Sequence, residues 1–221
     1  NAPGGRRYSG WIQPDGTRIE YAADICQFAP VALGVASIEQ GRQLLATLDR
    51  RIAVLEKDFD YAGRASLSAY WPVPDAVNPL PWQRKFGVYM NGGSFMAQTY
   101  WEIMARARCD DAEGALDRLE KFAEGLHQTS FMGNNWYDMQ GNVGFSPADE
   151  PYLSDMIAVS GSLINGLLGI NPTWDQLAVN PHLPKDWNDV AADVVYKGFR
   201  HHITIRGGQV SVEKKERVIT P

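Results

Sequence analysis

The chain has 221 residues, of which 44% are hydrophobic and 21% are charged, and its formal net charge at pH 7 is −5. These proportions are ordinary for a globular protein with a buried core, and the acidic balance disfavours nucleic acid as a partner, because nucleic acids attract basic patches. No run of about 18 apolar residues is present, so the sequence predicts no membrane-spanning segment and no membrane partner.

The first part of the chain is predicted to fold as a helical hairpin. Residues 14–16 (Pro-Asp-Gly) favour a tight turn, and apolar residues at helical spacing follow between residues 19 and 36. Ser37 and Gln40 form a capping-box pattern, which starts a second helix that ends at about Glu56. Because almost no residues separate the two helices, we expect them to pack as an αα-hairpin.

The long segment between residues 57 and 90 is predicted to be an ordered loop. It contains several prolines, which interrupt helices, and several aromatic residues, including Trp71 and Trp82. Long loops in compact proteins are usually functional or disordered, and aromatic residues are scarce in disordered segments. We therefore expect this loop to lie over one end of the fold.

A second hairpin and a buried helix are predicted next. The turn at residues 91–93 precedes a helix over 94–108, and a helix with a regular apolar stripe covers 112–126. A second loop, over 128–150, leads to a helix over 152–168. This last helix is apolar on most sides, which indicates that it is buried.

The last part of the chain is predicted to form strands. β-Branched stretches over 192–196, 199–206 and 209–213 are separated by glycine-containing turns, a pattern typical of a β-meander. Helices followed by strands indicate segregated helices and sheet. The sequence therefore predicts two domains, residues 1–170 and residues 171–221.

Three groups of residues, in a fixed order along the chain, carry a resemblance to a known superfamily. The groups are Gly10-Trp11 with Asp15-Gly16 and Gln27, then Asn91-Gly92-Gly93 with Trp101, then the run from Leu167-Leu168-Gly169 through Pro181-His182-Leu183-Pro184 and Trp187 to Tyr196-Lys197-Gly198. Together they resemble the six-hairpin glycosidase superfamily. They are nearest in pattern to the cellobiose phosphorylase family and its hydrolase relatives.

The resemblance implies a mainly α fold. Residues 1–170 are then expected to form helical hairpins of an (α/α) toroid, present as a partial barrel, with residues 171–221 as a small antiparallel β appendix packed on it. A closed ring of such hairpins needs about twice the number of helices predicted here. In the phosphorylase relatives the general acid precedes the segment that matches Gly10–Gly16. The resemblance therefore implies a missing N-terminal half of the same polypeptide, or a second chain, as a partner.

The resemblance also implies a glycoside hydrolase that acts on an oligosaccharide or glycoside, represented by its C-terminal portion. A glycoside phosphorylase is an alternative, but Ala97, Ile157 and Val159 stand where phosphorylase relatives hold phosphate, and these side chains cannot bind an anion. A non-catalytic carbohydrate-binding or structural fragment is the other alternative. The seven tryptophans and nine tyrosines agree with a carbohydrate substrate, although aromatic rings also fill cores.

Two acidic residues of the second loop form the candidate catalytic pair. Hydrolysis with inversion needs a protonated carboxyl group and a carboxylate about 6.5–9.5 Å apart, and burial beside aromatic rings raises a carboxyl pKa. Loop carboxylates near aromatic residues are therefore the candidates. They are Asp138, which follows Asn-Asn-Trp-Tyr, and Glu150, which precedes the last helix. An acidic residue near a helix start has the alternative role of stabilising the helix dipole.

The candidate substrate-binding residues are aromatic, amide and acidic side chains and glycines of the loops and helix starts. They are Gln27, Trp71, Trp82, Asn91, Gly92, Gly93, Trp136 and Asp155. Each has a structural alternative: tryptophans fill cores, Asn-Gly-Gly favours a turn with positive φ, and an acid in a first helical turn interacts with the dipole. The Gln27 amide has the alternative of binding a neighbouring helix.

The sequence predicts neither a metal site nor a cofactor. Cys26 and Cys109 do not form a CxxC motif and are expected to be free thiols, with one disulfide as the alternative. His201 and His202 are adjacent in a predicted strand, where neighbouring side chains point to opposite faces. No nucleotide-binding fingerprint is present.

Overall fold

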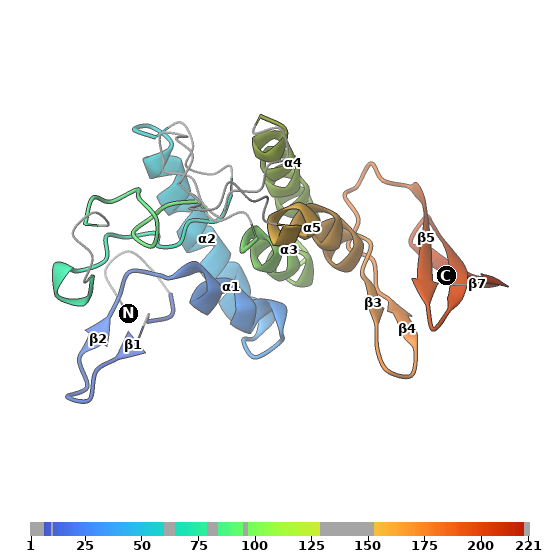
Figure 1. Ribbon diagram of the computed structural model, residues 1–221, viewed down its shortest axis with the longest axis horizontal. Helices are drawn as coiled ribbons and strands as arrows, with labels where there is room; N and C mark the ends of the chain where they lie inside the picture. The colour runs from blue at the N-terminus through green and yellow to red at the C-terminus, as the bar shows by residue number, and fades with distance from the viewer. Residues whose placement is uncertain are drawn as a thin grey trace.

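The computed structural model of the chain describes residues 7–9, 11–59, 65–78, 84–94, 97–128 and 153–218. The chain passes from a short β-hairpin at one end, through a group of helices, to a three-stranded sheet at the other end (Figure 1). The longer strands therefore follow the helices along the chain, as the sequence predicts.

Five α-helices and one π-helical segment occupy the middle of the described chain. They are α1 (Asp24–Ala32), α2 (Ile38–Leu55), α3 (Thr99–Arg108), α4 (Ala112–Gln128), α5 (Leu153–Gly161) and the π-helical η3 (Ser162–Leu167), which continues α5. A short 3-10 helix, η1 (Asp75–Val77), lies in the long loop. The predicted helix over 94–108 thus begins later, at Thr99, because Ser94 forms a bridge with Leu67 and residues 97 and 98 form a turn.

The described strands form three antiparallel sheets. The pairs are β1 (Trp11–Ile12) with β2 (Arg18–Ile19), and β3 (Ile170–Pro172) with β4 (Leu177–Val179). The third sheet has the order β5 (Asp189–Tyr196), β6 (Phe199–Arg206) and β7 (Gln209–Arg217). The predicted β-meander is confirmed, with β5 and β7 longer than predicted.

The first helical hairpin forms as the sequence predicts. Ser37 Oγ accepts a hydrogen bond from the Gln40 amide at 3.2 Å, and Gln40 Oε1 accepts one from the Ser37 amide at 2.9 Å, so the predicted capping box is confirmed. One turn further, Gly41 packs closely, because a Cβ there would lie 2.5 Å from Cys109 Sγ. A glycine at this position lets α2 approach the end of α3.

Helix α3 is the centre of the helical part. It packs against α1, α2, α4, α5 and η3, and it buries Ile103, Ala105 and Ala107. A toroid places helices side by side around a central axis, whereas here the helices surround one helix. The predicted mainly α toroid is therefore wrong for the described chain, which is a mixed fold of short helices and antiparallel sheets.

The C-terminal sheet shares a hydrophobic core with the helices. Ile203 and Ile205 of β6 are buried in a cluster with Leu168 and Ile170 at the end of η3. Trp187 packs against this cluster and also against the cluster around Ile103 of α3. The inner face of the sheet is thereby fixed to the helical part.

Candidate functional site

The Asn91-Gly92-Gly93 turn holds the long loop together. Asn91 is buried; its Oδ1 accepts a hydrogen bond from the Val73 amide at 2.8 Å, and its Nδ2 donates to the Arg84 carbonyl at 3.0 Å. The side chain therefore ties two stretches of the loop that are distant in sequence. These hydrogen bonds give Asn91 a structural role in the loop that was not predicted from the sequence, and its role in substrate binding stays a prediction.

Backbone conformation requires glycine at position 92, and close packing requires it at position 93. Gly92 has a φ of +101°, which side chains with a Cβ rarely adopt, and its amide donates to Ser68 Oγ at 3.0 Å. At Gly93, a Cβ would lie 2.7 Å from the Tyr89 backbone nitrogen. The Gly93 carbonyl accepts from the Ser68 amide at 2.8 Å, so the turn is bound to the buried stretch that contains Ser68.

Trp71 follows this buried stretch and is contacted by two cations. The guanidinium carbon of Arg7 lies 4.3 Å from the Trp71 ring centroid, and that of Arg51 lies 5.5 Å away. Arg51 Nε also donates to the Tyr70 carbonyl at 2.8 Å, and burial lowers the pKa of Arg51. Cation–π contacts of this kind stabilise the ring in place. Trp71 is half-buried, and stacking of a sugar on it stays a prediction.

Gln27 of α1 is completely buried. Its Oε1 accepts from the Tyr8 amide at 2.8 Å, and its Nε2 donates to the Tyr8 carbonyl at 3.0 Å. The carboxamide thus pairs with one backbone residue near the start of the chain. It binds a neighbouring segment, as its structural alternative describes, although that segment is not a helix.

A buried ionic network that was not predicted from the sequence lies beneath the loop. Glu102 of α3 is completely buried; its Oε2 accepts from Ser66 Oγ at 2.6 Å, and its Oε1 accepts from Arg106 Nε and Arg118 Nε, both at 3.0 Å. Arg106 also pairs with Asp49 of α2 and with Asp111, the latter at 2.8 Å. The network links α2, α3, α4 and the stretch before Trp71.

The charges in this network shift the pKa of Glu102 strongly. Burial alone raises the pKa of a carboxyl group, but the charges of Arg118 and Arg106 and the hydrogen bond from Ser66 outweigh it, and the pKa falls to about 2. For Arg106, burial lowers the pKa, and the Glu102 and Asp49 carboxylates raise it overall. Glu102 is therefore ionised at neutral pH, and both of its oxygens are engaged, so it cannot serve as a general acid.

The helical spacing of Glu102 and Arg106 is the one sequence feature that indicates part of this network. Glu102 and Arg106 are four residues apart on one helix, which brings their side chains together. Such pairs usually lie on exposed surfaces, and the alternation of charged and apolar residues in α3 gave no indication that this one is buried. Glu102 is buried because α3 packs against α4, which contributes Arg118.

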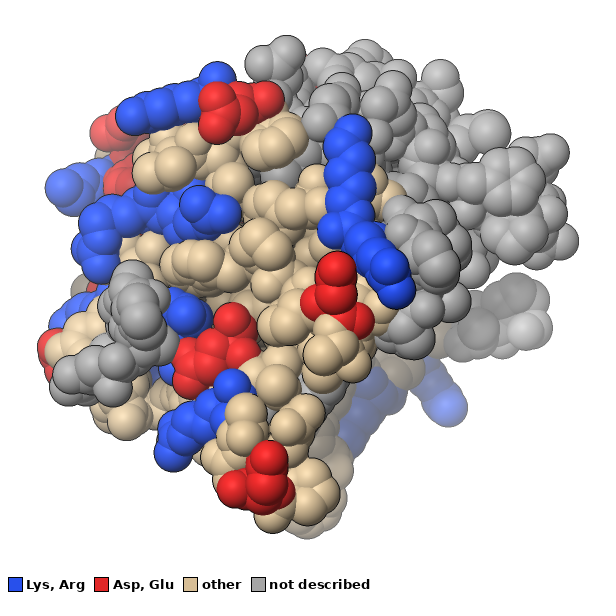
Figure 2. All heavy atoms as spheres, turned by 90° about the vertical axis from the view of Figure 1, so that its left-hand side faces the viewer, with Lys and Arg blue, Asp and Glu red and all other residues tan. Residues whose placement is uncertain are grey.

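A pocket of about 300 Å³ is lined in part by residues of the network. Its lining includes carboxylates and cations, but the described ion pairs already join Asp49 and Asp111 to Arg106, and Asp117 to Lys121. On the end of the molecule that carries β1 and β2, basic and acidic side chains are also interspersed (Figure 2). Neither region gathers charge of one sign.

Several predicted site residues lie outside the described residues. Trp82, Trp136, Asp138 and Glu150 are among them, so the roles predicted for them stay predictions. Asp155 belongs to the first turn of α5, and the role predicted for it also stays a prediction. Of the predicted set, the structure brings together the Asn91-Gly92-Gly93 turn and the stretch that contains Trp71.

The cysteines and the adjacent histidines are placed as expected. Cys26 and Cys109 are free thiols, and burial raises the pKa of Cys109. His201 Nδ1 lies 3.0 Å from the Phe199 carbonyl, whereas His202 Nδ1 lies 3.0 Å from Asp193 Oδ1. Among the described residues, no group of three or more His, Cys, Asp or Glu side chains could hold a metal ion.

The tail of the chain matches a known domain. Residues 171–220 match the C-terminal domain of glycosyl hydrolase family 65. The match covers β3 to β7, and it supports the interpretation of this segment as the C-terminal portion of a glycosidase-family protein. The finer likeness to the cellobiose phosphorylase family stays a prediction. None of the curated proteins compared with the chain matches it. Within the described part of the chain, no helix has the length and apolarity needed to cross a bilayer.

Proposed function

We propose that the chain is the C-terminal portion of an enzyme that hydrolyses the glycosidic bonds of oligosaccharides or glycosides. The observation that carries this proposal is the match of residues 171–220 to the C-terminal domain of glycosyl hydrolase family 65. The described core supports assigning the helices to the same protein fold as the matched segment. Trp187 and Leu163 pack both against the cluster around Ile203 of β6 and against the cluster around Ile103 of α3. The segment that matches the family is thus built into the same fold as the helices.

The reaction that we propose needs an acid and a base. Glu102 is excluded as the acid by its low pKa and its four hydrogen bonds from Ser66, Arg106 and Arg118. We assign the base or substrate-anchoring role to Asp138 and Glu150, and propose that a preceding part of the same polypeptide, or a second chain, supplies the general acid. The buried network around Glu102 would then position the loop rather than transfer protons.

Hydrolysis is favoured over phosphorolysis by the apolar residues at three positions. Ala97, Ile157 and Val159 stand where the resemblance expects phosphate to be held, and none of their side chains has a hydrogen-bond donor for an anion. Ile157 is 63% exposed, so its apolar side chain faces solvent near the start of the α5–η3 helix. A phosphate at this position would lack side-chain hydrogen bonds.

The test is turnover by the natural polypeptide purified from its source, with a panel of disaccharides in buffers with and without inorganic phosphate. We expect release of free monosaccharide in both buffers, at equal rates. Asp138→Asn and Glu150→Gln should each lower the rate about 10²–10⁴-fold if they act as acid–base groups. Asp58→Asn, at an exposed position after α2, is the matched control and should leave the rate unchanged.

Three results would contradict the proposal. Formation of a sugar phosphate that requires inorganic phosphate would show a phosphorylase. Saccharide binding without any cleavage would show a non-catalytic binding protein. Normal rates in both loop variants would show that the catalytic residues lie elsewhere.

A further inference from the structure

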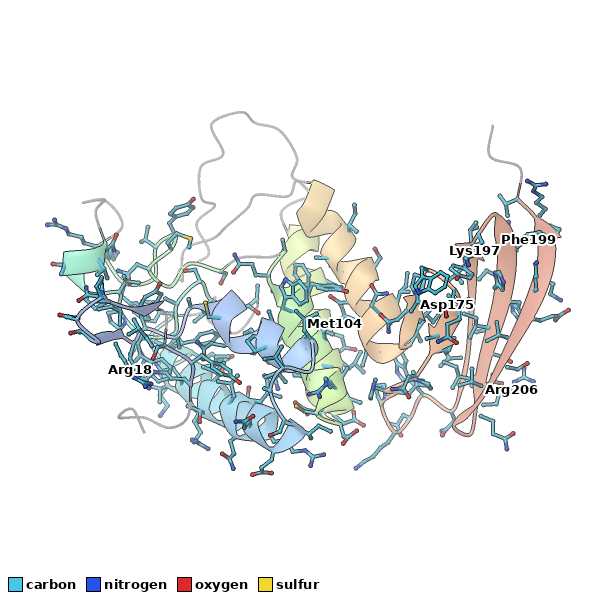
Figure 3. The ribbon with its side chains drawn as sticks, turned by 90° about the horizontal axis from the view of Figure 1, so that it is seen from below. Arg18, Met104, Asp175, Lys197, Phe199 and Arg206 are labelled. Atoms are coloured by element: carbon cyan, nitrogen blue, oxygen red, sulfur yellow. The ribbon has the colours of Figure 1, made fainter. Side chains whose placement is uncertain are left out.

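A second pocket, separate from the loop and from the Glu102 network, lies where the helices meet the β3–β4 hairpin. It has a volume of about 250 Å³ and is lined by side chains of α1, α3, η3 and the hairpin, among them Met104, Arg108, Asn165, Asn171, Asn180 and His182. We call it the helix–hairpin pocket. Met104 lies on α3, between α1 and the α5–η3 helix (Figure 3).

The backbone at Gly169 positions the hairpin side of this pocket. Gly169 has a φ of +63°, and a Cβ there would lie 1.7 Å from the Asn180 carbonyl oxygen, so no other residue fits. The close crossing lets the Asn180 amide donate to the Gly169 carbonyl at 2.9 Å, and the His182 amide donate to the Leu167 carbonyl at 2.8 Å. Asn180 and His182 are thereby fixed against the end of η3.

The helix side of the pocket includes a π-helical turn. The Leu168 amide donates to the Leu163 carbonyl at 2.9 Å, which is the wide spacing of a π-helix. Asn165, within this turn, accepts from the Tyr100 hydroxyl at 3.3 Å and donates to the Ile170 carbonyl at 2.8 Å. π-Helical turns are uncommon and occur frequently at functional sites. Here the turn places Asn165 at the pocket wall.

Polar groups of the pocket keep unused hydrogen-bonding capacity. Arg108 Nη1 donates to the Ala36 carbonyl at 3.1 Å, while its Nε and Nη2 have no partner among the described residues. Asn171 Nδ2 donates to the Asn165 carbonyl at 3.2 Å, and its Oδ1 has no described partner. Among the described residues, the Asn180 side chain has one hydrogen-bond contact, between its Nδ2 and His182 Nε2 at 3.4 Å. The pocket therefore offers a ligand both hydrogen-bond donors, from Arg108, and acceptors, from Asn171 and Asn180.

This combination suits a hydroxyl-rich neutral ligand better than an anion. Each hydroxyl group both donates and accepts, so it can use the Arg108 donors and the Asn171 and Asn180 carbonyl oxygens together. Those same oxygens would repel an anion, and the C-terminal ends of α1 and α3, near Ala32 and Arg108, carry partial negative charge. The apolar surface of Met104 suits the C–H groups of a sugar ring.

We infer that the helix–hairpin pocket binds one sugar ring of a neutral saccharide, through Arg108, Asn171 and Asn180. Its volume lies just below the ~300–1,000 Å³ range of drug-sized ligand sites, which limits the occupant to a single ring. The inference goes beyond the proposed function, because the pocket contains none of the residues to which cleavage is assigned. Binding here requires no turnover.

The test is a titration of the ¹⁵N-labelled chain with D-glucose, D-galactose and D-mannose, followed by NMR. We expect the side-chain amide signals of Asn171 and Asn180 to move along one saturable curve for at least one sugar. Sodium glucuronate and inorganic phosphate are titrated in parallel as anionic probes. The backbone spectrum in each variant reports whether the fold is intact.

Variants locate the site. Asn180→Ala should raise the dissociation constant about 2–10-fold, since it removes one hydrogen-bonding side chain, and exposed Asn188→Ala is its matched control. Ala32→Leu, which fills the pocket, should abolish the saturable shift at Asn171. The same substitution at Ala53, an exposed position on α2, should leave binding unchanged.

Three outcomes would overturn the inference: no saturable shift with any neutral sugar, saturation by glucuronate or phosphate alone, or normal binding in a folded Ala32→Leu variant. None of these depends on cleavage. A natural polypeptide that binds sugar here but cleaves none would contradict only the proposed function. Cleavage without sugar binding in this pocket would contradict only the inference about the pocket.

Discussion

At the scale of single residues, Glu102 organises the part of the chain beneath the loop. Its carboxylate receives hydrogen bonds from Ser66, Arg106 and Arg118, which belong to the stretch before Trp71, to α3 and to α4. A buried carboxylate is tolerated only when its charge is compensated, and two guanidinium groups compensate this one. Removal of the negative charge would leave those two cations buried without it.

Glu102→Gln should therefore destabilise the fold by about 3–5 kcal/mol at pH 7, measured by urea unfolding. The pKa of Glu102 is about 2 in the folded protein, below its ordinary value of 4.5. The stabilisation from its charge, on the order of 3 kcal/mol, is present above pH 4.5 and is lost as the pH falls towards 2. The difference between wild type and variant should shrink over that range.

Glu120→Gln, at an exposed position on α4, is the control for this measurement and should change stability by less than about 0.5 kcal/mol. An equally small effect of Glu102→Gln would show that the network does not stabilise the fold. A difference between wild type and the Glu102 variant that stays constant down to pH 2 would show that the Glu102 pKa is not lowered.

At the scale of elements, α2 shows how a local pattern defines a helix. The capping box at Ser37 and Gln40 satisfies two backbone amides at the helix start, and the apolar stripe that follows buries Leu44, Leu45 and Leu48. The start of this helix therefore follows from residues that are neighbours in sequence. Its burial depends on α1, α3 and the loop.

Ser37→Ala should lower the free energy of unfolding by about 1 kcal/mol, because the Gln40 amide loses its acceptor at the exposed start of α2. The measurement is urea unfolding followed by circular dichroism at 222 nm. Ser211→Ala, on the exposed strand β7, is the comparison and should have little effect. Equal stability of the two variants would mean that the cap contributes nothing measurable.

At the scale of the whole molecule, Trp187 connects the sheet and the helices. Its ring packs against the cluster of Ile103, Leu119 and Leu167 and against the cluster of Ile203 and Ile205. A shared core makes the unfolding of one part expose apolar surface of the other. We therefore expect the chain to unfold as one cooperative unit.

Trp187→Ala should cost about 3 kcal/mol and shift a single unfolding transition. The transition is measured by circular dichroism, which reports the helices, and by NMR signals of β6, which report the sheet. Trp174 is 88% exposed at the tip of the β3–β4 hairpin, so Trp174→Ala is the matched control and should cost less than about 0.5 kcal/mol. Separate transitions for helices and sheet in wild type would contradict the shared core.

The predicted toroid failed because local patterns do not specify how helices are arranged. Helical spacing correctly placed α2 and α4, but it could not show that α3 buries Ile103 and Ala107 against several helices at once. For the candidate site, spacing and residue type singled out Gln27 and Asn91. Their partners Tyr8 and Val73 come from distant parts of the chain, and these contacts are visible only in the fold.

The sequence by itself determined that the long strands follow the helices, the capping box at Ser37 and the β-meander, which it predicted from residue 192. Each depends on residues close together in the chain, where capping, turn chemistry and side-chain alternation act. The tertiary structure alone decided the packing around α3, the buried pairing of Glu102 with Arg118, and the helix–hairpin pocket. These depend on contacts between residues far apart in sequence, which no local pattern encodes.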